Sequence, residues 1–149
     1  MSAKDHIQPY QMKLFYDAHD LMNMRAGDDE EWDQYDTLSP YNQPRMLKDN
    51  PELVQEKRTE SKEQSYFDDD TNTFSEGSLE QSIRNEGVKH PVSIAFLPTN
   101  EPVIWNGHHR IVVAHDIDPD MYVPHTYIKN GPTGQSWTSS YAEKLKKSR

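Results

Sequence analysis

The chain has 149 residues, of which 33% are hydrophobic and 28% charged, and it contains no cysteine. This length fits one domain with one modest core. The lack of cysteine excludes disulfides, thiolate metal sites and cysteine nucleophiles. The formal net charge is −9, and it is uneven, because residues 1–76 carry a net −10 and residues 77–149 a net +1.

The charge distribution and the N-terminus also limit the partners. Proteins that bind duplex DNA through its phosphates usually have a basic face, and here basic residues cluster only in the tail, at Lys144, Lys146, Lys147 and Arg149. Strong nonspecific DNA binding is therefore not expected. The first residues lack the pattern of a signal peptide, and no segment reaches the ~20 apolar residues that span a membrane. We expect a soluble, cytoplasmic protein without a membrane partner.

Residues 1–75 are expected to form an acidic, mainly helical extension that packs on the rest. Apolar residues at helical spacing predict a helix from Lys13 to Met24, which Gly27 ends. Residues 28–36 follow with six acids in nine positions. They predict a solvated turn or helix face, with Trp32 and Tyr35 as its two anchoring aromatic residues.

Two further segments complete this extension. Asn50 as a cap, with Pro51 at the first helical position, predicts a helix from Pro51 to about Gln64. The polar run from Asp68 to Thr73 predicts a loop. We place the boundary of the next module directly after this run.

Residues 76–130 predict a small α+β core, with a mixed sheet and short helices. Ser78 as a cap and Gly87 as a stop predict a helix at about 78–86. Runs rich in β-branched and aromatic residues predict strands at 91–97, 103–105 and 122–128, and a helix begins near His108 and ends by 116–120. Residues 131–149 are expected to be a linker and a basic tail, in which Trp137 and Tyr141 suggest a short helix.

The most informative segment is Asn106-Gly107-His108-His109-Arg110. A strand that turns through glycine into a helix leaves backbone N–H groups at the helix start, where the helix dipole also favours an anion. Arg110 can hold a phosphate in a bidentate manner, and the two histidines add donors whose charge changes near neutral pH. Alternatively, Arg110 pairs with a local carboxylate such as Asp116, and the histidines only cap the helix.

A divalent metal site is the second chemical possibility. Five of the seven histidines lie between residues 90 and 125. Two histidines and a carboxylate could ligate a metal that activates water for phosphodiester hydrolysis, and the weak candidates are His108, His115 and Asp116. His115 is also explained as a histidine that interacts with the last carbonyls of its helix.

The order of these motifs resembles the ParB N-terminal/sulfiredoxin-like superfamily. The resemblance covers roughly 50 residues and rests on two boxes, Ser82-Ile83 to Pro91-Val92 and Gly107-His108-His109-Arg110. Within it, the chain is similar to the small phage-encoded ParB-like nuclease-domain proteins with a Gly-His-His-Arg box. The resemblance implies that Asn106, Gly107, His108, His109, Arg110 and Gly87 bind a nucleotide phosphate, and that a nucleoside triphosphate with Mg²⁺ is a possible cofactor.

Departures from the family limit what carries over. The residue after the box glycine is His108 where sulfiredoxins have their catalytic cysteine, so this chain is not a sulfiredoxin. Only about 20 residues follow Ile128, too few for the DNA-clamp domains of chromosome-partitioning ParB proteins. Related free serine kinases use an upstream glutamate as the base, and spacing does not rank the candidates Glu60, Glu63, Glu76 and Glu80.

These observations lead to two hypotheses from different classes. In the first, the chain is a ParB-like phosphate-binding protein that acts on nucleotide or nucleic acid. One form of this hypothesis is a metal-assisted DNA nuclease of phage origin in the host cytoplasm. Gly107 and Arg110 then hold phosphate, and His108 or His109 donates to it or acts as general acid or base. In the second, the chain is a noncatalytic interaction protein whose acidic segment 28–36 or 68–70 binds a basic host protein.

Overall fold

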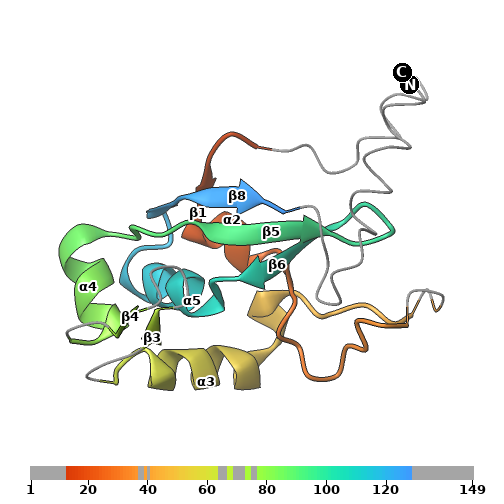
Figure 1. The fold of residues 1–149 in the computed structure, drawn as a ribbon, viewed down its shortest axis with the longest axis horizontal. Helices are drawn as coiled ribbons and strands as arrows, with labels where there is room; N and C mark the ends of the chain where they lie inside the picture. The colour runs from red at the N-terminus through yellow and green to blue at the C-terminus, as the bar shows by residue number, and fades with distance from the viewer. Residues whose placement is uncertain are drawn as a thin grey trace.

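The computed structural model describes residues 13–36, 39, 41–63, 67–68, 73–74 and 77–128. They form a mixed α+β fold around a four-stranded sheet with the order β2-β6-β5-β8 (Figure 1). These strands are β2 (Arg25–Ala26), β5 (Val92–Phe96), β6 (Pro102–Asn106) and β8 (His125–Tyr127). β2 runs parallel to β6, β6 antiparallel to β5, and β5 parallel to β8, so the sheet is mixed.

Two smaller ladders accompany the sheet. β1 (Tyr16–Asp17) pairs antiparallel with β7 (Tyr122–Val123), and β3 (Phe67–Asp68) pairs with β4 (Thr73–Phe74). The prediction of a loop over the whole run 68–73 is therefore wrong at both ends, where Asp68 and Thr73 face each other in a ladder. The predicted strand 122–128 is divided at Pro124 between β7 and β8.

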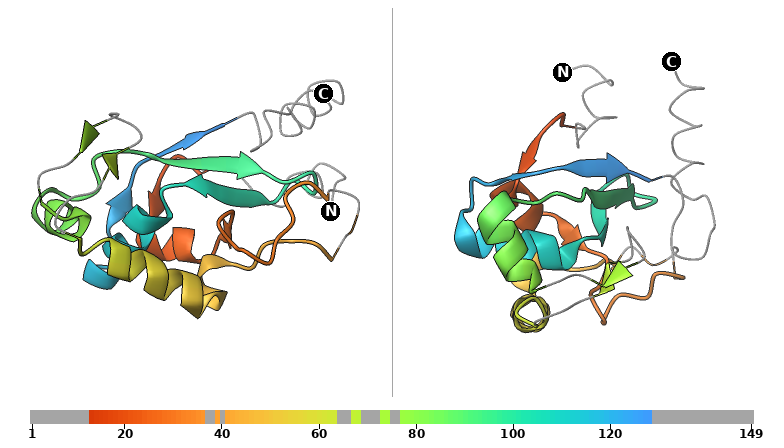
Figure 2. Two further views of the ribbon diagram at one scale, coloured as in Figure 1. Left: turned by 60° about the horizontal axis from the view of Figure 1, so that its bottom comes forward. Right: turned by 60° about the vertical axis from the view of Figure 1, so that its left-hand side comes forward.

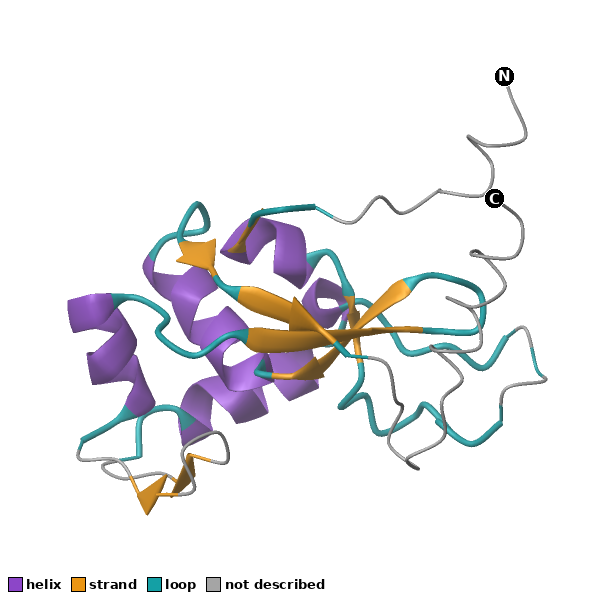
Figure 3. Ribbon diagram, turned by 45° about the horizontal axis from the view of Figure 1, so that its top comes forward, coloured by secondary structure: helices purple, strands orange, loops and turns teal. Residues whose placement is uncertain are grey.

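The helices are α2 (Ala18–Met22), α3 (Pro51–Glu60), α4 (Leu79–Glu86) and α5 (His108–Ile117), with a 3₁₀ turn η1 at Leu47–Asp49. Figures 1 and 2 show α2, α3 and α5 on one side of the sheet and α4 at one end. Figure 3 distinguishes the helices, in purple, from the strands, in orange. None of the described helices has the length and apolar character needed to cross a bilayer.

Local capping chemistry explains where the helices begin and end. Asn50 accepts a hydrogen bond from the Leu53 N–H, and Pro51 opens α3, as predicted. Ser78 caps α4 through a reciprocal pair of bonds with Gln81. Gly87 ends α4, as predicted, with a φ of 74° and a ψ of −172°, which differs from the left-handed helical conformation common at such stops.

The first helix is shorter than predicted. Asp17 caps α2 through a capping box with Asp20, which makes Ala18 the first helical residue. Tyr16 and Asp17 are held in an extended conformation by their pairing with β7. The helix ends at Met22, before Gly27 is reached. From Tyr16 onward, the apolar residues of the predicted span are buried in one core by a strand followed by a helix, whereas Leu14 is 85% exposed.

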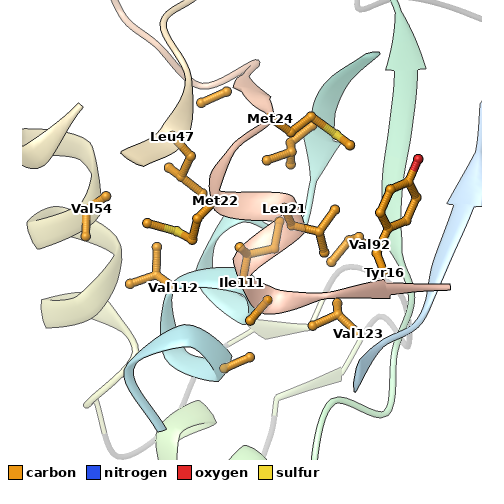
Figure 4. Packing of buried hydrophobic residues seen from close by; sticks show 14 of the residues in the cluster. Tyr16, Leu21, Met22, Met24, Leu47, Val54, Val92, Ile111, Val112 and Val123 are labelled. Atoms are coloured by element: carbon orange, nitrogen blue, oxygen red, sulfur yellow. The ribbon is translucent and has the colours of Figure 1, made fainter. Parts of the chain in front are cut away.

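Both halves of the chain contribute to one hydrophobic core. Figure 4 shows α2, η1 and α3 side chains packed against those of α5, β5 and β7. Among the members of this cluster with no exposed surface are Leu21, Leu47, Val92, Ile94, Ile104, Ile111 and Val123. This shared packing fixes α2, α3 and β2 relative to the start of α5.

The acidic segment 28–36 forms turns and irregular loop, not a helix. Trp32 packs edge-to-face on Trp105 of β6, with 6.4 Å between ring centroids. Tyr35 is 66% exposed. The segment thus has one aromatic anchor, and the prediction that Tyr35 is a second one is wrong.

Candidate functional site at the first turn of helix α5

Gly107 connects β6 to α5 and is required by geometry. Its φ of 100° and ψ of 18° lie in the left-handed region, which side chains with a Cβ rarely adopt. A Cβ at this position would lie 2.6 Å from Val92 Cγ1 and 3.1 Å from Val92 Cα. The glycine therefore lets the helix start close against β5, and this role is independent of any ligand.

The parallel pairing of β2 and β6 places Asp28 beside His108. The carboxyl ends of neighbouring parallel strands lie at the same edge of a sheet, and here the residues that follow the two strands meet there. Gly27 donates its N–H to the Ile104 carbonyl at 2.9 Å, and a Cβ on Gly27 would lie 2.5 Å from that oxygen. Gly27 thus allows β2 and β6 to approach each other closely. It does not terminate a helix, contrary to the prediction.

Both ring nitrogens of His108 lie next to Asp28. The Asp28 N–H donates to His108 Nε2 at 3.3 Å, and His108 Nδ1 lies 3.3 Å from Asp28 Oδ2. Because Nε2 accepts a hydrogen bond from the Asp28 backbone N–H, the ring proton of the neutral imidazole belongs on Nδ1, on the side of the carboxylate. These contacts hold the ring in one orientation.

Burial keeps His108 neutral, and neighbouring groups keep Asp28 ionised. The His108 side chain is 2% exposed, and desolvation lowers its pKa to about 4, an effect that the nearby Asp28 carboxylate opposes. Desolvation raises the pKa of Asp28, but His108 and the hydrogen bond from Lys57 outweigh it, so the pKa of Asp28 is below its usual value. Near pH 7, His108 is therefore neutral and Asp28 is ionised.

Helix α3 packs against α5 and contributes two further groups. Lys57 Nζ lies 2.9 Å from Asp28 Oδ2, and Glu60 Oε1 lies 3.1 Å from His109 Nε2. Glu60, one of the four glutamates considered as a kinase base, is thus next to the second histidine. Sequence reasoning did not include Asp28 or Lys57 in the site. The spacing of Lys57 and Glu60, one helical turn apart, is the signal that could have indicated a shared face.

The remaining predicted phosphate-binding residues lie around this turn. Arg110 Nη1 donates to the Pro91 carbonyl at 3.2 Å, so the guanidinium reaches the segment that joins Gly87 to β5. Asn106 is the exposed last residue of β6, at an irregularity in its pairing with Ser93. Gly87 is at the end of α4, and a Cβ there would meet no atom within 4 Å.

The weak metal candidates do not converge on one position. His108 and His115 are two turns of α5 apart, which corresponds to about 10 Å. Asp116 accepts two hydrogen bonds from Arg58, at 2.7 and 2.9 Å. It is therefore the partner of Arg58 on α3 and not, as one alternative had it, of Arg110.

Within the described part of the chain, one group of three side chains has the spacing of a metal site: Asp17, His19 and Asp20. Both carboxylates already bond the backbone at the start of α2. Asp20 also pairs with Lys13 at 3.4 Å. Helix capping therefore accounts for these acids.

Comparison with protein-family models, with curated proteins and with solved structures finds no match for this chain. His108 is neutral and buried, so it is suited to positioning the first turn of α5 and not to contacting a ligand. His109, whose side chain is 38% exposed, and Arg110 are the groups of this turn that a solute can reach.

Proposed function

We propose that this chain is a ParB-like phosphate-binding protein that acts on nucleotide or nucleic acid, with the phosphate seated at the first turn of α5. The observation that carries the proposal is the unusual start of this helix. α2, α3 and α4 each have a side-chain cap and an acid in the first turn, whereas α5 has neither. Its start instead offers backbone N–H groups next to His109 and Arg110.

Each group then has a defined role. The backbone of the first turn and Arg110 hold the phosphate oxygens, since a guanidinium matches phosphate geometry. His109 donates to the phosphate or acts as general acid or base, because its ring is accessible and already bonded to the carboxylate of Glu60. His108 positions the turn by tying it to Asp28. Mg²⁺ or Mn²⁺, if the protein uses one, would accompany the phosphate.

The test is a thermal-shift titration with ATP, CTP, GTP, ADP and inorganic phosphate, each with and without Mg²⁺ or Mn²⁺. A ligand that binds only the native state raises the melting temperature in a saturable way. We expect such a shift in the natural protein and in Arg84→Ala, a control on α4, and its loss in Arg110→Ala. Absence of a shift with every ligand would refute the proposal. A positive result justifies nuclease and hydrolase assays.

A second candidate is a noncatalytic interaction protein that binds a basic partner. It is favoured by the surface of the segment 28–41, where Glu30, Glu31, Asp33 and Asp36 are exposed and Tyr35 and Tyr41 are 66% and 94% exposed. Residues 26–44 contain no lysine or arginine. Capture of a basic partner that is lost in a Tyr35→Ser, Tyr41→Ser double variant but kept in Arg110→Ala would support this candidate.

A further inference from the structure

Carboxylates from the protein itself hold the cationic and donor groups around the first turn of α5. One oxygen, Asp28 Oδ2, contacts both Lys57 Nζ at 2.9 Å and His108 Nδ1 at 3.3 Å. Glu60 Oε1 contacts His109 Nε2 at 3.1 Å. In this state, negative charge from Asp28 and Glu60 occupies positions that a bound anion could use.

Lys57 is placed unlike an ordinary surface lysine. Its side chain is 12% exposed, and a lysine so far removed from water needs a negative partner to remain charged. α3 is fixed against α5, so the ammonium group stays near the helix start whether or not Asp28 is bound to it. Removal of Asp28 without a replacement anion would leave a buried, unpaired charge.

Asp28, in contrast, is placed where its carboxylate can exchange. Its side chain is 44% exposed and belongs to a turn, not to a helix or strand. The segment is attached to the helix start independently of the carboxylate, because the Asp28 backbone N–H donates to His108 Nε2. The carboxylate can therefore leave Lys57 while the backbone of the turn keeps its place.

We infer that Lys57 is a further anion-binding residue of this site and that the Asp28 carboxylate is the internal anion which a bound phosphate displaces. The inference rests on the proposed function, since it concerns the same first turn of α5. In the exchange, the Lys57 ammonium breaks its contact with Asp28 Oδ2 and forms one with a phosphate oxygen. No covalent bond changes, and Asp28 becomes solvated.

The exchange selects a class of phosphate. A phosphodiester carries one negative charge, as does the carboxylate that it would replace, so Lys57 gains no attraction. A phosphomonoester or the terminal phosphate of a nucleotide carries up to two negative charges. Its attraction to the Lys57 ammonium increases with that charge. The site therefore suits a phosphomonoester or a nucleoside polyphosphate better than the backbone of a nucleic acid.

The experiment compares the affinities for pyrophosphate and for dimethyl phosphate, a monoanionic diester, by isothermal titration calorimetry. We expect Asp28→Asn, which keeps the shape of the side chain, to bind pyrophosphate about tenfold more tightly. Lys57→Gln should bind it about tenfold more weakly. Asp116→Asn, which removes another carboxylate at the α3–α5 contact, should differ less than about twofold from the natural protein.

Dimethyl phosphate should bind far more weakly than pyrophosphate to the natural protein. Melting curves establish that each variant is folded, and Lys57→Met replaces Lys57→Gln if the glutamine variant does not fold. If pyrophosphate binds and Arg110→Ala abolishes binding, but Asp28→Asn fails to tighten it or Lys57→Gln fails to weaken it, the inference is wrong and the proposed function stands. If neither the natural protein nor Asp28→Asn binds, both are wrong.

Discussion

Asp28 and His108 are eighty residues apart in the sequence, yet the Asp28 backbone N–H donates to His108 Nε2 at 3.3 Å, and the Asp28 carboxylate lies 3.3 Å from the other ring nitrogen, Nδ1. This pair ties the acidic N-terminal half to the start of α5. Burial keeps the imidazole neutral although the Asp28 carboxylate opposes this. Against the effect of desolvation, His108 and Lys57 lower the pKa of Asp28, which is ionised near pH 7.

The buried His108 should make stability depend on pH. Its pKa is about 4 in the folded protein against an ordinary value of 6.5. The unfolded chain therefore takes up the proton at a higher pH than the folded one. The free energy of unfolding is thus at its full value above pH 6.5 and falls as the pH drops toward 4, by up to about 1.4 kcal/mol per pH unit.

Urea unfolding between pH of about 7 and about 4.5 measures this slope. In His108→Gln most of it should disappear. His125, whose pKa is lowered by partial burial, contributes in the same direction, so His125→Gln serves as the comparison and should retain most of the slope. Identical pH dependence in His108→Gln and the natural protein would show that another group is responsible.

Gly107→Ala should destabilise the protein more than Gly87→Ala does. Both glycines have a positive φ, which strains any residue with a Cβ. Only at Gly107 would the new Cβ also meet Val92, at 2.6 Å. We expect a loss of about 2–4 kcal/mol for Gly107→Ala and about 1–2 kcal/mol for Gly87→Ala. Equal losses in urea unfolding would mean that β5 moves to accommodate the methyl group.

Asp29 should be more important for stability than the exposed acids around it. It is 4% exposed and accepts hydrogen bonds from the backbone N–H groups of Glu31 and Arg45 and from the Arg45 guanidinium. Loss of a buried carboxylate leaves these donors unpaired, so Asp29→Ala should cost about 2–4 kcal/mol. Asp33→Ala, at an exposed position in the same segment, should cost less than about 1 kcal/mol. Chemical denaturation of the two variants provides the comparison.

The ion pair between Arg58 and Asp116 should contribute modestly. It is bidentate, at 2.7 and 2.9 Å, but both side chains are about one-third exposed, so solvent screens the attraction. A double-mutant cycle with Arg58→Ala and Asp116→Ala should give a coupling of about 0.5–1 kcal/mol. The Glu80–Arg84 pair of α4, at 3.9 Å, should give about 0.3 kcal/mol. A coupling at Asp116 that changes on addition of Mg²⁺ would instead point to a metal there.

Capping positions could be predicted from the sequence because their chemistry is local. Asn50 with Pro51, Ser78 and Gly87 each act on residues within one turn. The structure confirms the predicted starts of α3 and α4 and the end of α4, but α3 ends at Glu60 and not near Gln64. The start of α5 after Gly107 follows from the same kind of signal. At α2 the local pattern predicts the wrong start, because the helix begins only after its cap Asp17. Asp17 is held extended by its pairing with β7, which is remote in the sequence.

The contacts around α5 could not be predicted in the same way. β2 has only two residues, Arg25 and Ala26, too few for the alternation that identifies a strand. Without β2 beside β6, nothing in the sequence brings Asp28 to His108. Lys57 and Glu60 lie on a helix that was predicted, but its orientation against α5 depends on packing of the whole core. Long-range register, and not residue type, was the missing information.

The parallel pairing of β2 with β6 also has a consequence for how the chain folds. Its two strands come from opposite halves of the sequence, and they cannot pair until the intervening chain has closed a long loop, which loses entropy before the contacts form. Domains dominated by such nonlocal contacts fold slowly. We expect the hairpin of β5 and β6 to form early, and the joining of β2 and α2 to it to limit the folding rate. During synthesis, most of the chain must therefore leave the ribosome before Asp28 can contact His108.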